Sequence, residues 1–373
     1  MKIDIEERVL HFKQPAGTSR GVYSERRIWL VSASDGSAVG YGECAPLPQL
    51  SCDDIPDYGE KLRVKSEEFS AAAEQGDAAI STFFESLRDY PSMLFGFETA
   101  LLDYKNAHLS PLTSHLIFDT PFSRGEAGIP INGLVWMGTF EEMQQRIEQK
   151  LEQGFRCVKL KIGAIDFDSE LELIKKIRRR FSHHDVELRV DANGAFTFDE
   201  ALYKLELLSQ YALHSIEQPI KAGQWSFMAE LCRESPLPIA LDEELIGVNE
   251  PEQKRQMLNI IRPRYIILKP SLHGGMMGCR EWIETARDMG IGSWITSALE
   301  SNIGLNAIAQ FCSAVYGDRI SMPQGLGTGQ LFTDNIPMPL EIRGDKLWKV
   351  EGGRWKVEGG RWKVEGGRLK VEG

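Results

Sequence analysis

The sequence of 373 residues lacks the features that mark several large classes of protein. It contains no apolar run long enough to span a bilayer, and its first residues, MKIDIEERVLHF, lack the continuous apolar core of a signal peptide. The net charge of −11 leaves little positive charge for a nucleic-acid surface or for an anionic membrane. We therefore expect neither a nucleic-acid partner nor membrane association.

Cysteine is scarce, and none of the six is arranged as a redox pair or a metal site. No CxxC motif occurs, and no histidine stands at metal-ligand spacing from a cysteine. Buried free thiols in a reducing compartment are the simpler interpretation, and they predict a cytoplasmic protein. The cysteines are Cys44, Cys52, Cys157, Cys232, Cys279 and Cys312.

A glycine-rich nucleotide-binding turn is also missing. Gly325, Gly327 and Gly329 alternate with other residues, but they lie near the end of the chain and open no clear helix, unlike the Rossmann fingerprint. The apolar fraction of 42% and the charged fraction of 26% are those of an ordinary globular protein. Length alone suggests about two or three domains, although a βα barrel can use roughly 250 residues.

The second half of the chain alternates short apolar runs with charged, helix-like stretches. Amphipathic stretches lie at 139–153, 168–181 and 197–211, and Thr139 and Thr197 precede acidic residues, as helix N-caps do. Strand–helix–strand units predict a parallel sheet, and eight strands fit a TIM-like barrel better than an open sheet. The expected strands are 129–135, 157–162, 187–191, 214–217, 238–242, 264–269, 293–297 and 321–325.

The first hundred or so residues predict a different architecture. Residues 22–34 and 38–44 flank Asp35-Gly36, a strong hairpin signal, and helical stretches follow near 59–74 and 92–107. A hairpin sheet followed by helices indicates an α+β domain. We expect four parts: an α+β domain at 1–125, a barrel at 126–325, a segment at 326–348 that returns to the first domain, and a tail at 349–373.

The tail repeats KVEGGRW in sevens. The period is not that of a coiled coil, because Gly-Gly recurs in every unit and would break a helix. Alternation around a Gly-Gly turn allows short strands, but the apolar content is too low for them to stand alone. We expect the tail to have no catalytic role.

Five polar residues end or interrupt the apolar runs, roughly 25 to 30 residues apart. They are Lys161, Asp191, Glu217, Asp242 and Lys269. Any one of them alone would be an ordinary strand-end charge, but the carboxyl ends of barrel strands converge on one pocket, so the ordered set predicts an active site. Carboxylates without nearby His or Cys favour Mg²⁺, or Mn²⁺, over zinc. Such an ion can coordinate a substrate carboxylate and stabilise the enediolate formed when the adjacent carbon loses its proton.

A base is needed beside that carbon, and a lysine can serve. Lys159 and Lys161 share one face of their strand, and each cation disfavours the charge of the other, which favours Lys161 as the base. Lys269 is expected to reach the pocket from the other side of the barrel.

With these motifs the chain resembles the enolase superfamily, in its muconate-lactonizing-like branch. The segments VKLK, VDANG, IEQP, ALDE and LKP stand in that superfamily's order, and the resemblance extends to about residue 345. It implies an α/β fold in which an N-terminal α+β capping domain covers a (β/α)7β barrel. It also implies that Asp191, Glu217 and Asp242 bind Mg²⁺, and that Lys161 and Lys269 form an acid/base pair on opposite faces.

Within that branch the chain is most similar to the o-succinylbenzoate synthase family. The segments that carry this resemblance are 131–138, 297–311 and 324–336. The family's reaction is the Mg²⁺-dependent dehydration of 2-succinyl-6-hydroxy-2,4-cyclohexadiene-1-carboxylate to 2-succinylbenzoate in menaquinone biosynthesis. Related proteins often have serine after Asp-Glu, where this chain has Glu244, so Glu244 could alter the surroundings of the metal ligands.

Further residues are expected around the site. Lys159, Asn193 and Glu243 would support the catalytic groups. The loops near 15–24 and 44–52 would close over an apolar ring and a succinyl carboxylate. The candidate substrate contacts are Arg20, Tyr23, Leu47, Ser297, Glu300, Ser301 and Gly325.

Three alternatives remain open. A dipeptide epimerase or N-acylamino acid racemase would keep the site and use Lys161 and Lys269 as two equal bases. A Schiff-base aldolase would use Lys269 but leave three carboxylates unexplained. A barrel that binds metal without catalysis would have no reason to retain both lysines. The sequence carries no signal for an oligomeric state.

Overall fold

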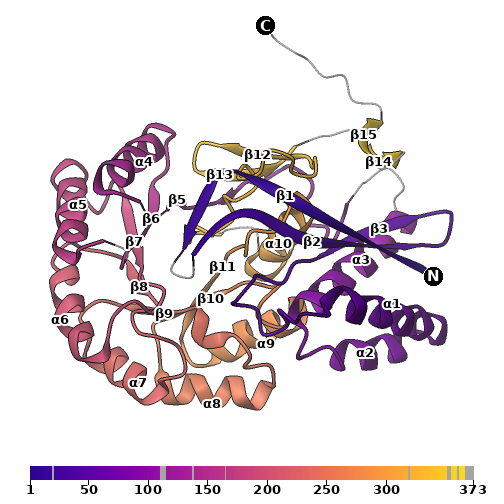
Figure 1. Cartoon of the computed structure of the whole chain (residues 1–373), viewed down its shortest axis with the longest axis horizontal. Helices are drawn as coiled ribbons and strands as arrows, with labels where there is room; N and C mark the ends of the chain where they lie inside the picture. The colour runs from indigo at the N-terminus through magenta and orange to yellow at the C-terminus, as the bar shows by residue number, and fades with distance from the viewer. Residues whose placement is uncertain are drawn as a thin grey trace, which may run out of the picture.

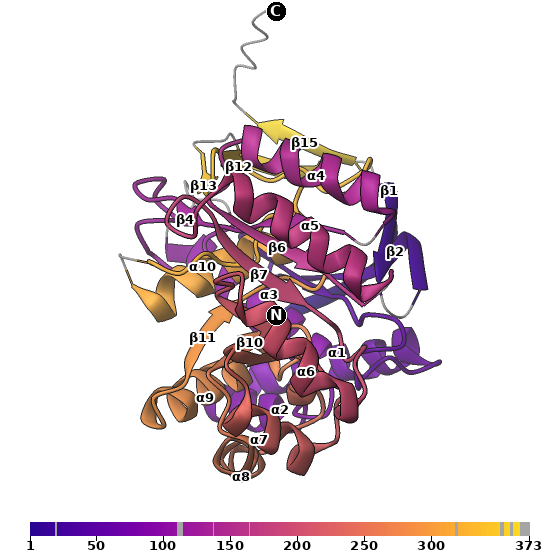
Figure 2. The same ribbon diagram turned by 90° about the vertical axis from the view of Figure 1, so that its left-hand side faces the viewer.

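The computed structural model describes residues 1–18, 21–109, 115–136, 138–163, 165–317, 320–350, 354–358 and 361–365. In these residues a small antiparallel sheet with three helices lies beside a curved parallel sheet whose helices form an outer layer (Figures 1 and 2). The predicted α/β fold with an N-terminal α+β part is therefore confirmed.

The N-terminal sheet is built from two hairpins. β1 (Lys2–Thr18) pairs with β2 (Gly21–Ser34), and β2 pairs with β3 (Val39–Cys44). Between β2 and β3, the Asp35 carboxylate accepts the amides of Ser37 and Ala38 at 2.9 and 3.1 Å, and Gly36 has a φ of 89°. The predicted Asp-Gly turn is therefore present, because glycine adopts this left-handed conformation without steric cost.

Two helices pack on this sheet, and a third packs on one of them. α1 (Tyr58–Gln75) and α3 (Pro91–Leu109) match the two predicted helices, and α2 (Asp77–Glu85) is an additional one. Phe69 and Phe83 stack at 5.1 Å in a core that is separate from that of the barrel. A separate core is what a domain requires, and the boundaries of the four expected parts stay a prediction.

The parallel sheet has seven strands in the order β11-β10-β9-β8-β7-β6-β5. Helices on its outer side alternate with these strands, so the predicted βα repeat is confirmed (Figure 1). The strands are β5 (Gly133–Val135), β6 (Cys157–Lys161), β7 (Glu187–Asp191), β8 (Ser215–Glu217), β9 (Ile239–Leu241), β10 (Tyr265–Leu268) and β11 (Gly292–Ile295). The helices are α4 (Phe140–Glu152), α5 (Phe167–Arg180), α6 (Phe198–Ser209), α7 (Trp225–Glu234), α8 (Pro251–Ile261), α9 (Gly275–Asp288) and α10 (Asn302–Tyr316), with a 3-10 turn at Glu243–Leu245.

Two of these helices begin at the predicted threonines. Thr139 accepts the Glu142 amide at 3.3 Å and donates its own amide to the Glu142 carboxylate at 2.8 Å, which forms a capping box. Thr197 precedes α6, and its amide donates to Glu200 at 3.1 Å.

The prediction of an eighth strand at 321–325 is wrong. In its place are single parallel bridges from Gln324 to Ile131 and from Gly325 to Thr296. The amide of Gln324 donates to Pro130 O at 2.8 Å and that of Gly325 to Ile295 O at 2.8 Å, so this segment joins the two ends of the sheet. A longer ladder does not form here because Pro323 has no amide hydrogen to donate.

The C-terminal segment returns across the molecule. Phe332 packs against Phe12 of β1 at 4.5 Å, and the Asp334 carboxylate accepts the His11 amide at 2.8 Å. β12 (Leu340–Arg343) pairs with β13 (Lys346–Lys349), which also pairs with β4 (Ile129–Pro130). In the repeat tail, β14 (Arg354–Glu358) pairs with β15 (Arg361–Glu365), the short strands that the Gly-Gly turns allowed.

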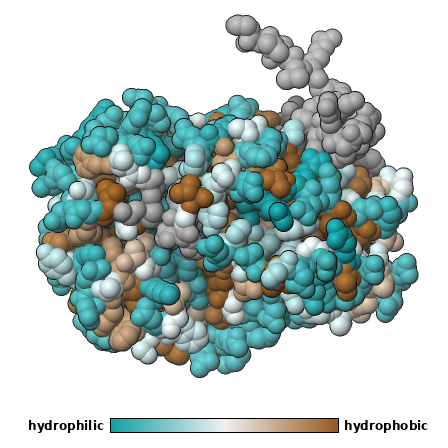
Figure 3. All heavy atoms as spheres, in the orientation of Figure 1, coloured by the Kyte–Doolittle hydropathy of each residue, from teal (hydrophilic) through white to brown (hydrophobic). Residues whose placement is uncertain are grey.

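On the face shown in Figure 3, hydrophobic residues occur in small groups among hydrophilic residues. None of the helices in the described parts of the chain has the length and apolar character needed to cross a membrane.

Candidate active site

The five predicted polar residues lie at one end of the barrel. Lys161, Asp191 and Glu217 are the last residues of β6, β7 and β8, and their Cα atoms are partners in register across the sheet. Asp242 and Lys269 directly follow β9 and β10. Successive side chains along a strand point to opposite faces of the sheet. Because these residues occupy equivalent positions at the ends of neighbouring strands, all five side chains point to the inside of the barrel.

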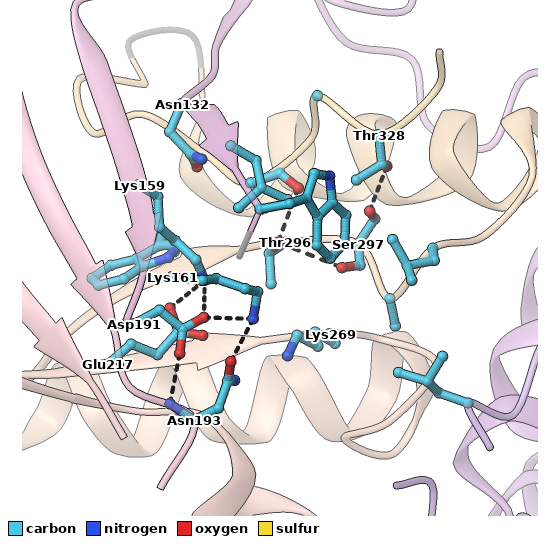
Figure 4. A pocket seen from close by; sticks show the side chains of 18 of the residues that line it. Asn132, Lys159, Lys161, Asp191, Asn193, Glu217, Lys269, Thr296, Ser297 and Thr328 are labelled. Atoms are coloured by element: carbon cyan, nitrogen blue, oxygen red, sulfur yellow. Dashed lines mark hydrogen bonds and ion pairs between the residues drawn. The ribbon is translucent and has the colours of Figure 1, made fainter. Parts of the chain in front are cut away.

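The lysines and carboxylates contact one another in this pocket (Figure 4). Lys159 Nζ lies 2.5 Å from Glu217 Oε2 and 2.9 Å from Asp191 Oδ2. Lys161 Nζ donates to the same Asp191 Oδ2 at 3.0 Å. Lys269 donates to Asp242 from the far side, with three strands between its own strand and that of Lys161. The structure therefore brings together all five residues and places the two candidate acid/base lysines on different sides.

Burial and neighbouring charges oppose each other in setting the pKa of Lys159, Lys269 and Asp191, whereas at Glu217 they act together. Burial alone would lower the pKa of Lys159 and of Lys269, but the surrounding carboxylates outweigh it and raise both. Burial raises the pKa of Glu217 well above its usual range, and the negative charge of Asp191 adds to this effect. Burial would also raise the pKa of Asp191, but the ammonium groups of Lys159 and Lys161 hold it below its usual range.

The donor chemistry fits a hard divalent cation. Within the described residues, Glu217 Oε1 and Asp242 Oδ1 are buried oxygens that have no hydrogen-bond partner. Carboxylate oxygens in this position are the ligands that Mg²⁺ prefers. In the same residues no group of three His, Cys, Asp or Glu side chains is arranged to hold an ion, and the lysines contact the carboxylates instead.

The predicted supporting residues lie around this cluster. The side-chain oxygen of Asn193 accepts from Lys161 Nζ at 2.6 Å, and its Nδ2 donates to Glu243 Oε1 at 2.9 Å. Asn193 has a φ of 45°, a left-handed conformation that asparagine tolerates better than most residues. Lys161 is thereby held between Asp191 and Asn193.

Glu244, which stands where related proteins often have serine, forms its hydrogen bonds with Gln218 and with the chain after β8. Its carboxylate accepts from Gln218 Nε2 at 2.9 Å and from the Gly223 amide at 2.8 Å. Gln218 also accepts the Asp242 amide at 3.3 Å. Glu244 therefore fixes the chain after β8, and Gln218 connects it to the backbone of Asp242.

A cavity opens above these residues, and it measures about 780 Å³ when the open space at its mouth is counted. Ser297, Gly325 and the predicted Leu47 line it, so the structure brings these three to the site. Ser297 and Thr328 hydroxyls lie 2.6 Å apart, and the backbone of Gly325 passes too close to Thr296 to leave room for a Cβ atom.

Several lining residues were not predicted. Asn132, Leu134 and Trp136 line one wall, and Trp294 and Thr296 line another. Both sets are spaced by two residues, so strand alternation from the barrel-facing residues was the signal that could have found them. Leu50, Ala298, Leu299, Gly327 and Thr328 come from loops, where no periodicity exists.

The structure does not bring three other candidates to the cavity. The Tyr23 hydroxyl donates to Pro48 O at 3.1 Å on the outer side of the cap. Glu300 accepts from Ser271, and Ser301 caps α10 and donates to Glu43. These side chains join segments of the chain, and their expected role as substrate contacts stays a prediction. Arg20 lies outside the described residues, so its role stays a prediction.

Comparisons with known proteins agree with this geometry. Residues 142–347 match the family described as Enolase C-terminal domain-like. The chain is 47% identical over 371 residues to an o-succinylbenzoate synthase of Desulfotalea psychrophila, covering 93% of this chain and 98% of the relative. It is 26% identical to a hydrophobic dipeptide epimerase of a Flavobacteria bacterium, covering 92% of this chain and 97% of the relative.

The fold is also that of a solved structure. The crystal structure of MenC from Desulfotalea psychrophila LSv54 superposes with a TM-score of 0.79 at 44% identity, covering 93% of this chain and 99% of the other.

Proposed function

The chain belongs to the enolase superfamily, and from this membership we propose that it is an o-succinylbenzoate synthase, a carbon–oxygen lyase of menaquinone biosynthesis. Its reaction would be the dehydration of 2-succinyl-6-hydroxy-2,4-cyclohexadiene-1-carboxylate to 2-succinylbenzoate. The observation that carries the proposal is the 47% identity over nearly the whole length of an enzyme of that name. Lys161, Asp191, Glu217 and Lys269 line one cavity, and Asp242 contacts Lys269 beside it.

Lys161 is the proton-transfer group in this proposal. Its Nζ is held by Asp191 and Asn193 at the wall of the cavity. There it can remove the proton beside the substrate carboxylate and then, protonated, donate to the leaving hydroxyl on the same face. The hydroxyl leaves as water with the bonding electron pair, and aromatisation drives the step.

Lys269 serves a different purpose. It enters from the opposite side of the barrel and is buried beside Asp242, so its charge is fixed before the reaction starts. A fixed ammonium group in a water-poor site stabilises negative charge as it develops on the substrate. No proton transfer by Lys269 is needed.

Asp191, Glu217 and Asp242 would hold Mg²⁺, or Mn²⁺. When bound, the ion supplies positive charge that stabilises negative charge on the substrate carboxylate. The two buried oxygens without hydrogen-bond partners, Glu217 Oε1 and Asp242 Oδ1, support this assignment within the described residues.

A second candidate function rests on the 26% identity to the epimerase, because the same two lysines can act as paired bases on opposite faces. To test the first candidate function, the pure protein is incubated with the cyclohexadiene carboxylate and Mg²⁺, and 2-succinylbenzoate is measured by ultraviolet absorbance and mass spectrometry. We expect the substrate to be converted stoichiometrically to 2-succinylbenzoate. If no product forms and the protein instead interconverts isomers of an N-acyl amino acid or dipeptide, the second candidate function replaces the first. The cytoplasmic location stays a prediction that accords with six free thiols.

A further inference from the structure

Arg26 is a buried arginine at the junction of the cap and the barrel. It lies on β2 with Ile28 and Leu30 on the same face, and it is 2% exposed, whereas the next residue, Arg27, faces solvent. The hydrogen-bond partners described for its guanidinium are carbonyl oxygens. A buried arginine would ordinarily pair with a carboxylate, so this arrangement calls for a reason.

The four carbonyls come from two separate loops. In the cap, Arg26 donates to Pro46 O at 2.5 Å and to Ala45 O at 2.6 Å. In the barrel, it donates to Leu299 O at 3.3 Å and to Ala298 O at 3.4 Å. One side chain therefore joins two segments that are more than 250 residues apart in the sequence.

Both loops line the active-site cavity. Leu47 and Leu50 extend from the cap loop, and Ala298 and Leu299 from the barrel loop. Leu47 and Leu299 also belong to one apolar cluster. Leu299 has a φ of 65°, a left-handed conformation that is strained for a residue with a side chain and persists only where its surroundings hold it.

We propose that Arg26 is a positioning residue that fixes the apolar wall of the cavity by holding residues 45–50 and 297–299 against each other. Through this wall it sets the fit of the part of the substrate that lies away from the three carboxylates. The identity of that substrate part, a succinyl arm, rests on the proposed function, whereas the coupling of the two loops does not.

The guanidinium is chemically suited to this task. It presents five N–H donors in a rigid plane, enough for carbonyls on two sides, whereas lysine has one nitrogen on a flexible stem. Burial lowers the pKa of Arg26, and the negative charges of Glu300 and Glu43 oppose that effect. A shorter or neutral side chain would leave carbonyls of both loops without donors.

The kinetic test compares Arg26→Lys with Arg27→Lys, its exposed neighbour on the same strand. For Arg26→Lys we expect KM for the cyclohexadiene carboxylate to rise at least about tenfold while kcat stays within about threefold, because the wall binds substrate but does no chemistry. Mg²⁺ affinity and the Arg27→Lys constants should match those of the wild type. An unchanged KM, or a fall in kcat at unchanged KM, overturns the proposal.

Amide hydrogen exchange tests the same coupling without activity. The amides of Leu47 and Ser51 in the cap loop, and of Ala298 and Ser301 in the barrel loop, are hydrogen-bonded in the structure. In Arg26→Lys both sets should lose protection together, by roughly tenfold or more, and neither should in Arg27→Lys. Unchanged exchange in either loop overturns the proposal. If the wild type lacks dehydratase activity, only the proposed function fails, and this measurement still decides the role of Arg26.

If Arg26→Lys does not fold, a double-mutant cycle in the wild-type background tests the coupling of the two loops. Leu47→Ala and Leu299→Ala lie on the two loops that Arg26 joins. We expect their effects on KM to be non-additive, since either change loosens the same wall. Strictly additive effects would mean that the loops act independently, and the proposal would be wrong.

Discussion

Replacing the two active-site lysines in turn separates a one-face dehydration from a two-base racemisation. Lys161 is bonded to Asp191 and Asn193, and Lys269 contacts Asp242 from the other side of the barrel. If Lys161 moves both protons, Lys161→Ala should eliminate turnover and also the exchange of the substrate proton with solvent. The remaining lysine cannot substitute, because it faces the opposite side of the reacting carbon.

Lys269→Ala should slow the reaction without eliminating it. Removing one preorganised charge beside a developing oxyanion costs about 10²–10³ in kcat, or about 2.7–4 kcal/mol. The structure favours the upper part of this range, because the Lys269 side chain is only 13% exposed and little water can replace its charge. The change also removes the ion-pair partner of Asp242, so kcat should be measured at saturating Mg²⁺.

The assay is deuterium incorporation from D₂O by each single mutant. It is run on the cyclohexadiene carboxylate and on both enantiomers of an N-acyl amino acid. Lys175→Ala, a change of a half-exposed lysine on α5, is the control for handling and should behave as the wild type. Dehydration by Lys161→Ala at near wild-type rate would refute the one-face mechanism. So would a pattern in which each mutant still exchanges the proton of one enantiomer.

Three further predictions concern the metal, pH and the tail. Chelation with EDTA should abolish activity, and added Mg²⁺ should restore it; full activity after exhaustive chelation would contradict the metal assignment. Asp242→Asn should weaken metal affinity at least about tenfold, while circular dichroism shows that the fold is intact. Glu98 accepts the amides of Met276 and Met277 at the start of α9, and burial raises its pKa from 4.5 to about 7. Its contribution to the free energy of unfolding is therefore complete below about pH 4.5 and is lost as the pH rises through 7. In urea unfolding, the free energy of unfolding should fall less steeply over this pH range in Glu98→Gln than in the wild type, and an equal fall in both would exclude Glu98 as the cause. Deleting residues 352–373 leaves β13 intact, so kinetics and melting temperature should stay nearly unchanged, whereas a loss of several degrees would mean that the repeats pack on the body.

The sequence predicted the barrel and its chemical groups well because both follow from local periodicity. Lys161, Asp191 and Glu217 each end an apolar run, and the carboxyl ends of the strands in a closed barrel all lie on the same face of the barrel. The expected strand at 321–325 failed for an equally local reason. Closing the barrel requires two bridges at Gln324 and Gly325, and an apolar pattern does not distinguish two bridges from a ladder.

The positions of the candidate substrate contacts were less predictable because they depend on how the cap meets the barrel. Glu300 and Ser301 stand in a motif-rich segment and were expected in the cavity, but the structure uses them to bind Ser271 and Glu43. Leu299, their neighbour, does line the cavity. Leu299 has a left-handed backbone conformation, which affects which of the three adjacent residues faces the site. No pattern in the sequence predicts this conformation.

The same contrast explains how chemistry and substrate choice can vary separately in this fold. Lys161, Asp191 and Glu217, which we propose for the acid/base and metal-binding roles, are strand-end residues held in register by the sheet, so we expect changes in the cap to leave their spacing intact. The apolar wall is made by two loops, one from the cap and one from the barrel, and Arg26 donates to carbonyls of both. We expect substitutions there to move the wall without moving Lys161 or the carboxylates. A dehydratase and an epimerase can therefore share the five polar residues and differ in what lies opposite them.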